Sequence, residues 1–351
     1  MKILVNLVFV PKEPTGLANY SLSLLKYLSL PDVEILSSRT YKNLTNDFGI
    51  KGHFRRLWWT QSTLPKIYQK QRAGLIFSPI PEAPLFTKCR FAVTVHDLIP
   101  LRFPQWFSKA QIFYCRYYLR QVLHQADRIF CNSLTTAKDV QHFLDVPEKK
   151  LVITPLGCDH DQFQFLDLPT SNYFLYIGRG NPHKNVDRLI RAFAQLPQVK
   201  NQIKNYELWL AGSFDSRYTP RLQQLATELG IQTQVKFLDY VPDRELPILI
   251  NRAIALVFPS LWEGFGLPVL EAMACGTPVI TSNLSALKEV AGEAAILVNP
   301  YATAEITSAM QDLLVDQGLR SYLSDRGLAR AKQFTWQKTA TATQTVLQSY
   351  S

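Results

Sequence analysis

A buried-strand pattern that leads through a glycine loop into a helix start is the feature that most constrains the fold of this chain. Residues 254–258 form an apolar run of strand length, and Pro259 ends it. Gly264 and Gly266 follow, and Pro268 stands at the first helical position, where a missing backbone N–H costs nothing. Such a unit builds a parallel α/β sheet, and its glycines let a phosphate approach the unpaired N–H groups of the helix.

The same unit recurs along both halves of the chain. Residues 3–10 predict a buried strand, and leucines at helical spacing mark residues 17–28, behind the loop that holds Gly16. In the first half, residues 107–123 predict one further helix. The second half begins the same pattern again, with a strand at 173–177, a turn and an amphipathic helix. At 351 residues the chain suits two domains, with ligands bound beyond the carboxyl ends of the strands.

Charged side chains stand where these loops would meet a ligand. Glu263 and Glu271 lie eight residues apart, and because carboxylates repel phosphate we expect them to accept hydrogen bonds from sugar or ribose hydroxyls. Arg179 and Lys184 flank a helix start, where the dipole does not favour cations. They are therefore either solvated or directed at a diphosphate, and a glycine loop alone is also common as a structural turn.

The full string over residues 259–279 decides between these alternatives. It contains Pro-Ser, Glu-Gly-Phe-Gly-Leu-Pro, a second glutamate eight residues after the first, and Ala-Met-Ala-x-Gly-x-Pro-Val. It resembles the signature of retaining nucleotide-sugar glycosyltransferases of the GT-B fold, glycosyltransferase family 4. The resemblance implies an α/β fold of two Rossmann-like doubly wound domains that face each other across a cleft. These would be an acceptor-side domain at 1–168, onto which a C-terminal helix at 335–351 packs, and a nucleotide-sugar domain at 169–334.

The resemblance also implies an activity and the roles of residues. The enzyme would move a hexosyl group, with mannosyl or glucosyl favoured, from a nucleotide-diphosphate sugar to a glycan or lipid-linked acceptor with retention of configuration. Glu263 would support the oxocarbenium-like transition state and Glu271 would bind ribose. His96, which follows the strand at 91–95, would lie near the donor sugar, although a lone histidine there is more often structural. The implied donor-binding residues are Gly16, Arg179, Lys184, Gly264, Phe265, Gly266, Leu267 and Glu271.

The chain departs from the family pattern at three places. Thr15-Gly16 replaces the usual Gly-Gly, Asp239 replaces a common glycine, and Lys288 precedes Glu289 where proline is usual. The change at Asp239 affects the place where the family recognises the base through its backbone. The base and sugar of the donor therefore stay open.

No metal and no cofactor other than the donor substrate is expected. Asp159-His160-Asp161 has the Asp-x-Asp form that holds a cation in the other large glycosyltransferase fold, GT-A. Here it stands at a domain boundary, where family 4 has a comparable Gly-x-Asp, so a metal site is disfavoured. The five scattered cysteines, without a Cys-x-x-Cys pair, indicate reduced thiols in a cytosol.

The net charge of +10 is concentrated in the first half, where residues 1–165 hold 21 basic and 12 acidic side chains. Residues 39–72, from Arg39 to Arg72, carry eight basic residues and one acidic residue, interleaved with aromatic residues. This pattern predicts peripheral contact of a cytoplasmic protein with an anionic membrane or an anionic acceptor, and a solvated face or a soluble sugar acceptor are the alternatives. No apolar run is long enough to span a membrane.

Other function classes fit less of the sequence. A nucleic-acid-binding protein has only the charge in its favour, lacks a recognised module and leaves Glu263 and Glu271 unexplained, so no nucleic-acid partner is expected. A nucleotide-sugar-binding protein without turnover, or a GT-B relative that acts as an epimerase or phosphorylase, would keep the same donor loops and stays an alternative.

Overall fold

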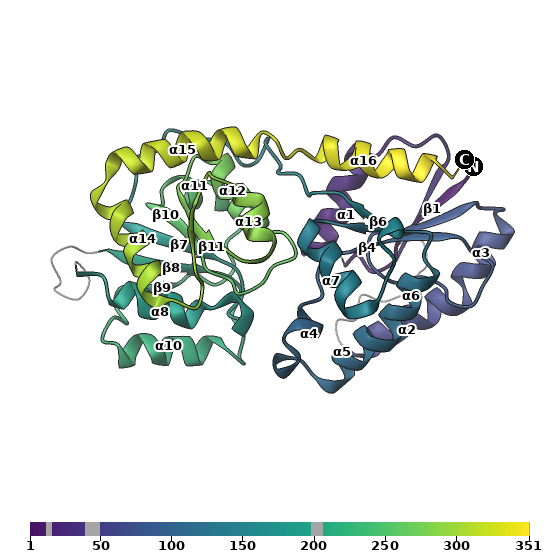
Figure 1. Ribbon diagram of the computed structural model, residues 1–351, viewed down its shortest axis with the longest axis horizontal. Coiled ribbons are helices and arrows are strands. Elements are labelled where there is room, and N and C mark those ends of the chain that lie inside the picture. Colours follow the sequence, from purple (N-terminus) through teal and green to yellow (C-terminus); the bar gives the residue numbers. More distant parts are fainter. Residues whose placement is uncertain (12–15, 39–49, 198–205, 351) are drawn as a thin grey trace. The chain divides into compact units, whose positions relative to one another are not determined.

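The computed structural model describes residues 1–11, 16–38, 50–197 and 206–350 (Figure 1). It divides into two compact units. Unit 1 comprises Met1–Gly157 and Trp336–Ser351, and unit 2 comprises Cys158–Thr335. Within the described ranges, no helix combines the length and the apolar character needed to cross a membrane.

Unit 1 is built on a parallel sheet of six strands in the order β2-β1-β3-β4-β5-β6. The strands are β1 (Ile3–Leu7), β2 (Val33–Ser37), β3 (Leu75–Ser78), β4 (Phe91–Val95), β5 (Arg128–Cys131) and β6 (Leu151–Ile153). The helices are α1 (Gly16–Tyr27), α2 (Ile50–Ser62), α3 (Leu64–Lys70), α4 (Ile99–Arg102), η1 (Pro104–Trp106), α5 (Lys109–Phe113), η2 (Tyr114–Leu119), α6 (Arg120–Gln125), α7 (Leu134–Leu144), η3 (Glu148–Lys150) and α16 (Trp336–Gln348).

Unit 2 repeats this architecture with the strand order β12-β11-β10-β7-β8-β9. Its strands are β7 (Tyr173–Ile177), β8 (Glu207–Ala211), β9 (Val235–Phe237), β10 (Ala255–Phe258), β11 (Val279–Ser282) and β12 (Ile296–Val298). Its described helices are η4 (Pro182–Lys184), α8 (Val186–Ala194), α10 (Thr219–Glu228), α11 (Leu246–Asn251), α12 (Leu267–Ala274), α13 (Ser285–Ala291), α14 (Thr303–Val315) and α15 (Gln317–Ala331).

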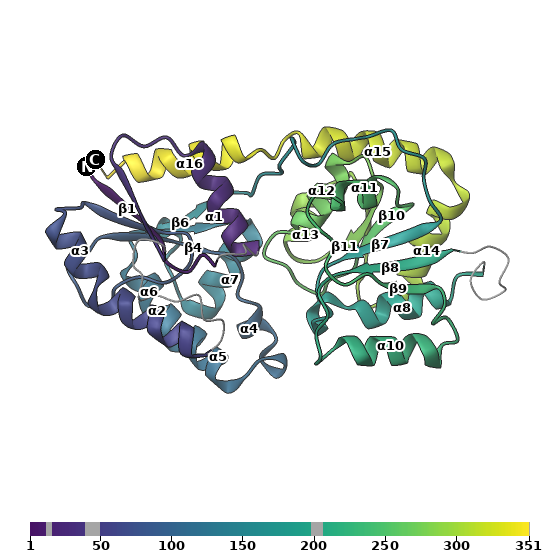
Figure 2. The ribbon, with the colours of Figure 1, turned by 180° about the vertical axis from the view of Figure 1, so that it is seen from behind.

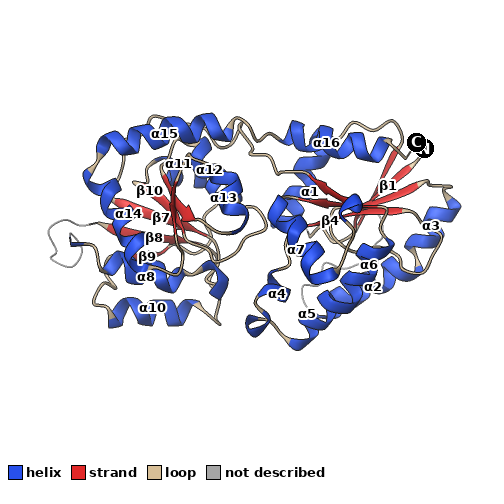
Figure 3. Cartoon of the chain, viewed as in Figure 1, coloured by secondary structure: helices blue, strands red, loops and turns tan. Residues whose placement is uncertain are grey.

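The composition of the central strands explains both sheets. Every residue of β1, β4, β10 and β11 is buried, because helices flank the sheets and leave the central strands no exposed face (Figure 3). Near-continuous apolar strands are typical of parallel sheets covered on both faces. The predicted α/β fold of two Rossmann-like doubly wound domains is therefore confirmed.

The last helix, α16, belongs to unit 1 and runs alongside α1 (Figures 1 and 2). The Trp336 ring lies 6.0 Å from the Tyr20 ring, measured between centroids. The Thr339 hydroxyl donates to the Pro155 carbonyl at 2.7 Å, close to the residue where the chain leaves unit 1. Leu347 and Ala340 of α16 are fully buried, so the helix is part of the core of unit 1 and not an appendage.

The helix predicted over residues 107–123 is present over residues 109–125, as α5, η2 and α6 in continuous succession. Its middle segment, η2, is π-helical, so this segment adds a residue per turn that periodicity in the sequence does not reveal.

Candidate functional site

The candidate site of unit 2 is assembled from the loops that follow β7 and β10. These strands are adjacent and parallel, so their carboxyl ends lie at the same edge of the sheet. Residues 178–185 leave β7, and residues 259–266 connect β10 to α12. Ligands of open parallel sheets bind at this edge.

Lys184 and Glu263 form an ion pair that joins the two loops. The Lys184 Nζ donates to Glu263 Oε1 at 2.7 Å, and only 9% of Glu263 remains exposed to solvent. The same ammonium group lies 5.2 Å from the centre of the Phe258 ring, at the end of β10. The structure thus brings together two of the predicted site residues that are 79 positions apart in the chain.

Neighbouring loops hold this pair in place. The Glu263 backbone N–H donates to the Ser285 hydroxyl at 3.2 Å, and the Leu261 N–H donates to the His183 carbonyl at 2.7 Å. Asn185, beside Lys184, donates its side-chain amide to the carbonyls of Pro259 and Pro300. The roles of Asn185 and Ser285 could not be predicted from the sequence, because hydrogen bonds between distant loops leave no local pattern.

Glycines open the edge of the sheet where side chains would block it. Gly266, the residue before α12, has φ +123°, and a Cβ there would lie 2.6 Å from the Leu287 side chain. A Cβ on Gly212, after β8, would lie 2.0 Å from the Gly178 carbonyl oxygen after β7. Glycine is therefore required at the start of α12 and at the close approach of two loops.

Glu271 lies on α12, about one turn beyond the glycine loop, and is half-buried. Burial, with a smaller contribution from the nearby Asp243 carboxylate, raises the pKa of Glu271 to about 7. A carboxyl group with this pKa changes charge near neutrality, which is frequent at functional sites.

Changing Glu271 to glutamine should alter how stability depends on pH. In the folded chain this carboxyl binds a proton up to about pH 7, whereas in the unfolded chain it ionises near 4.5, so wild-type stability falls as pH rises through this window. Relative to Glu271→Gln, we expect the wild-type free energy of unfolding to fall by at most about 3 kcal/mol between pH 4.5 and 7.5. Denaturant unfolding of both proteins across this range measures the difference. The exposed-site variant Glu228→Gln is the control, and parallel profiles for wild type and Glu271→Gln would contradict the assignment.

The other site residues predicted in unit 2 range from exposed to buried. Arg179 is exposed, and its backbone carbonyl accepts a hydrogen bond from the Tyr176 hydroxyl at 2.9 Å. The Phe265 ring is buried and packs edge-on against Phe334 at 6.0 Å. Gly264 and Leu267 are half-buried at the two ends of the turn into α12. That Arg179 and Lys184 both point at a diphosphate stays a prediction.

His96 and Gly16 belong to unit 1. The His96 Nε2 lies 2.9 Å from the Pro79 carbonyl oxygen, and the Asn132 amide nitrogen lies 3.4 Å from His96 Nδ1. Both contacts are satisfied if Nε2 carries the proton, and burial lowers the pKa of His96 to about 4, so the ring is neutral at pH 7. Gly16 is the exposed first residue of α1, with open space where a Cβ would stand. Their roles near a donor stay predictions.

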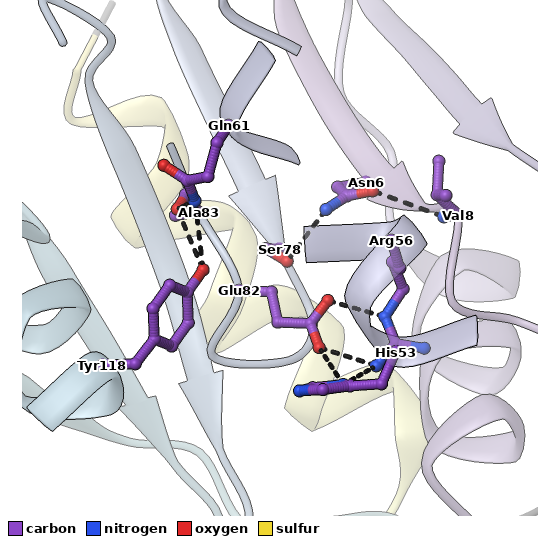
Figure 4. A network of polar contacts seen from close by, with 9 residues as sticks. All are labelled: Asn6, Val8, His53, Arg56, Gln61, Ser78, Glu82, Ala83 and Tyr118. Carbon is purple, nitrogen blue, oxygen red and sulfur yellow. Dashed lines mark hydrogen bonds and ion pairs between the residues drawn. The ribbon is translucent and has the colours of Figure 1, made fainter. Parts of the chain in front are cut away.

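A further polar network of unit 1 lies after β3 (Figure 4). Arg56 on α2 donates two hydrogen bonds to the buried Glu82 carboxylate, at 2.7 and 2.8 Å. A third Arg56 donor reaches His53 Nδ1 at 2.8 Å, and burial lowers the pKa of His53, which keeps this nitrogen an acceptor. Gln61 donates to the Ala83 carbonyl and extends the connection between α2 and this loop. Arg56 belongs to the stretch 39–72 that was predicted to be a basic surface. In the structure its guanidinium instead pairs with the buried Glu82 carboxylate.

The Asp159-His160-Asp161 segment is a capped turn in the structure. The Asp159 carboxylate accepts from the backbone N–H groups of Asp161 and Gln162, and His160 Nε2 lies 3.1 Å from the Phe334 carbonyl oxygen. Within the described part of the chain, no three His, Cys, Asp or Glu side chains are grouped as a metal ion would require. The five cysteines, all within it, are buried and free.

Sequence comparison identifies relatives across both units. A family model described as Glycosyl transferases group 1 matches residues 159–330, and one described as Glycosyltransferase Family 4 matches residues 14–162. O-antigen chain mannosyltransferase B of Escherichia coli is 33% identical over 265 residues, which cover 72% of this chain and 69% of that protein. O-antigen chain mannosyltransferase RfbU of Salmonella typhimurium is 29% identical over 89% of this chain and 90% of its own length. The match to the mannosyltransferase WbdA of Escherichia coli spans about one third of that longer protein.

Solved structures share the fold along the whole chain. Sucrose-phosphate synthase from Thermosynechococcus elongatus superposes with a TM-score of 0.80 over 99% of both chains, at 21% identity. The Anabaena protein HepE, solved with UDP and glucose, superposes with a TM-score of 0.75 over 99% of this chain and 100% of its own, at 19% identity. Together with the glycine loop and the paired glutamates, these matches show that the chain belongs to glycosyltransferase family 4, the group 1 glycosyl transferases, and is a glycosyltransferase of the GT-B fold.

Proposed function

We propose that this enzyme transfers a hexosyl group, with mannosyl favoured, from a nucleotide-diphosphate sugar to a growing glycan or a lipid-linked acceptor, with retention of configuration and without a metal ion. The observation that carries the proposal is the Lys184–Glu263 pair at the carboxyl edge of unit 2, beside the start of α12. The names of the O-antigen mannosyltransferases support the mannosyl group and the glycan acceptor. HepE, with its bound UDP and glucose, supports a nucleotide-sugar donor.

The chemistry required is stabilisation of a leaving nucleotide diphosphate. An ammonium group has three N–H donors, so the Lys184 bond to Glu263 leaves donors for phosphate oxygens. Arg179, on the same loop, adds a second cation, and the N–H groups at the start of α12 add a partial positive charge. These groups supply the electrostatic stabilisation that a metal ion supplies in other enzymes.

The carboxylates take the remaining roles. Glu263, fixed beside Lys184, faces positive charge that develops on the sugar as the glycosidic bond breaks, and Glu271 accepts hydrogen bonds from ribose hydroxyls. Because the departing diphosphate gains a negative charge next to Lys184 as the glycosidic bond breaks, the cation and Glu263 each stabilise a different part of the same transition state.

A transfer assay with product analysis tests the proposal. GDP-mannose, UDP-glucose and other nucleotide sugars are offered with a mannose-containing glycan acceptor, and NMR reads the anomeric configuration of the product. We expect transfer with retained configuration that is unchanged by EDTA. Inversion, or a large loss of rate on chelation, would contradict the mechanism. Binding without transfer or hydrolysis would favour a non-catalytic protein, and an epimerised or phosphorolysed sugar would favour the other GT-B reactions.

Peripheral contact with an anionic membrane is also proposed, on α2. Residues 39–49 of the predicted basic stretch lie outside the described residues. On α2, Phe54 and Trp58 lie one turn apart and are 66% and 75% exposed, with the exposed Arg55 between them. Aromatic rings beside a basic side chain suit the interface of a bilayer with anionic lipids. Trp59 and Arg56, in contrast, face the interior.

Vesicle binding tests this contact. Replacing Phe54 and Trp58 with serine should reduce cosedimentation with vesicles that contain phosphatidylglycerol, because it removes the two rings that would enter the interface. The matched control is Phe214→Ser, which removes a comparably exposed ring from unit 2. Equal binding by both variants, or no dependence on lipid charge in the wild type, would remove the proposal.

A further inference from the structure

Unit 2 contains a pocket whose lining does not include Lys184 or Glu263. It has a volume of about 630 Å³ and lies between the starts of β7 and β8, residues 238–242 after β9, and α11. We call it the β8 pocket; Figure 2 labels the elements that form it. Its volume is in the range of small-molecule sites.

The β8 pocket extends to the amino edge of the sheet. Tyr173 and Glu207, which line it, are the first residues of β7 and β8, whereas the donor loops leave the last residues of β7 and β10. Four residues of strand separate Tyr173 from the end of β7, a distance of roughly 13 Å. The pocket therefore offers binding groups that are separate from Lys184 and Glu263.

A rigid aromatic floor lies in the pocket. The rings of Tyr173 and Trp209 are parallel within 2°, with centroids 3.9 Å apart. Both are fixed at their polar ends: Trp209 Nε1 donates to Glu207 Oε2 at 2.6 Å, and the Tyr173 hydroxyl donates to the Leu249 carbonyl at 2.7 Å. At the rim, the Tyr240 ring is 67% exposed. A flat ligand with an apolar face fits against such rings.

The charges of the lining restrict the ligand further. Glu207 and Glu245 contribute carboxylates, and Arg252 contributes a cation. Each carboxylate also faces a cation, since Lys236 lies 3.8 Å from Glu207 and Arg244 lies 3.6 Å from Glu245. The lining therefore has no strong excess of either charge that would select a phosphate or another strong ion. A wholly apolar ligand would remove these charged groups from water without offering them hydrogen bonds, and this would make its binding free energy unfavourable. A neutral ligand with many hydroxyl groups satisfies both conditions, because hydroxyls donate to carboxylates and accept from a guanidinium.

We propose that the β8 pocket binds a neutral oligosaccharide of hexopyranose units, whose C–H faces lie on Trp209 and Tyr240 and whose hydroxyls reach Glu207, Glu245 and Arg252. The identity of the sugar as mannose or glucose rests on the proposed function, since the glycan that this enzyme extends is then the available ligand. The pocket holds that glycan with groups other than Lys184 and Glu263.

Oligosaccharide titration of the full-length protein tests the inference, with mannotetraose and maltotetraose as probes and NMR saturation transfer or calorimetry as the readout. We expect one of the two probes to bind to the wild type and to bind to Tyr240→Ala about tenfold more weakly, the loss expected for one aromatic contact. Tyr322→Ala, which removes a similarly exposed ring from α15, should bind as the wild type does. Thermal melting shows that each variant is folded.

Three results would overturn the proposal: neither probe binds, Tyr240→Ala and Tyr322→Ala bind the probe equally, or a sulfated oligosaccharide binds more tightly than the neutral one. Glu263→Gln should leave probe binding intact, since it changes the donor loops alone; loss of binding in that variant would place the sugar at the donor site and overturn the proposal too. Transfer activity is measured on the same preparations, so a failure of the proposed function is seen separately from a failure of the β8 pocket.

Discussion

Replacing Glu263 with glutamine is expected to lower kcat by about 100–1,000-fold, the loss typical of one preorganised polar group in an active site. Glutamine keeps the size of the side chain and an oxygen that can accept from Lys184, but it removes the negative charge that we propose stabilises the transition state. Steady-state transfer from the preferred nucleotide sugar measures the effect, and it should appear in kcat more than in the KM for the donor.

Two controls separate catalysis from folding in this experiment. Glu228→Gln removes a carboxylate from an exposed position of α10 and should retain wild-type turnover. Thermal melting of Glu263→Gln should show a folded protein, because the Ser285 bond to the Glu263 backbone does not depend on the side chain. A folded Glu263→Gln enzyme with turnover within tenfold of the wild type would remove Glu263 from the mechanism.

Replacing Arg56 with methionine is expected to destabilise unit 1 by about 3–5 kcal/mol, the cost of leaving a buried carboxylate unpaired. Only 3% of Glu82 is exposed, and Arg56 donates both hydrogen bonds to its carboxylate, while His53 Nδ1 lies farther away, at 3.7 Å (Figure 4). The double variant Arg56→Met/Glu82→Gln removes the carboxylate as well and should recover most of the loss. Denaturant unfolding followed by circular dichroism gives the free energies.

An exposed ion pair of the same unit is the matched control. Arg90 lies 3.0 Å from Asp127, and their side chains are 50% and 33% exposed. Exposed pairs contribute about 0–1 kcal/mol, so Arg90→Met should cost far less than Arg56→Met. Equal losses of unfolding free energy in Arg56→Met and Arg90→Met would show that the burial of Glu82 does not determine the destabilisation.

Local pattern predicted the strands well. Residues 91–95 and 173–177 are strands β4 and β7 with the predicted bounds, because a short, mainly apolar run rich in β-branched and aromatic residues favours a buried strand of a parallel sheet. The glycine loop before α12 was also predicted, since Gly266 takes a positive φ that other residues rarely adopt. These features depend only on residues that are close together in the chain, so they can be predicted from the sequence.

Contacts between distant segments were not predictable in this way. Nothing near Ser285 in the sequence indicates that its hydroxyl accepts from the backbone of Glu263. In the same way, the charge count over residues 39–72 does not distinguish Arg55, which is exposed, from Arg56, which turns inward to Glu82. The side of α2 that faces the core is decided by tertiary packing, and composition averages over both sides.

The return of the chain to unit 1 has a consequence for its synthesis. The α1 face that α16 covers stays open while the ribosome makes residues 158–335, because residues 336–348 emerge only afterwards. Unit 2 is encoded as one uninterrupted segment and can finish folding first, although it is the later of the two to begin. We therefore expect the apolar surface of α1 that α16 covers to stay exposed until residues 336–348 have emerged, and transiently exposed apolar surface of this kind is what chaperones bind.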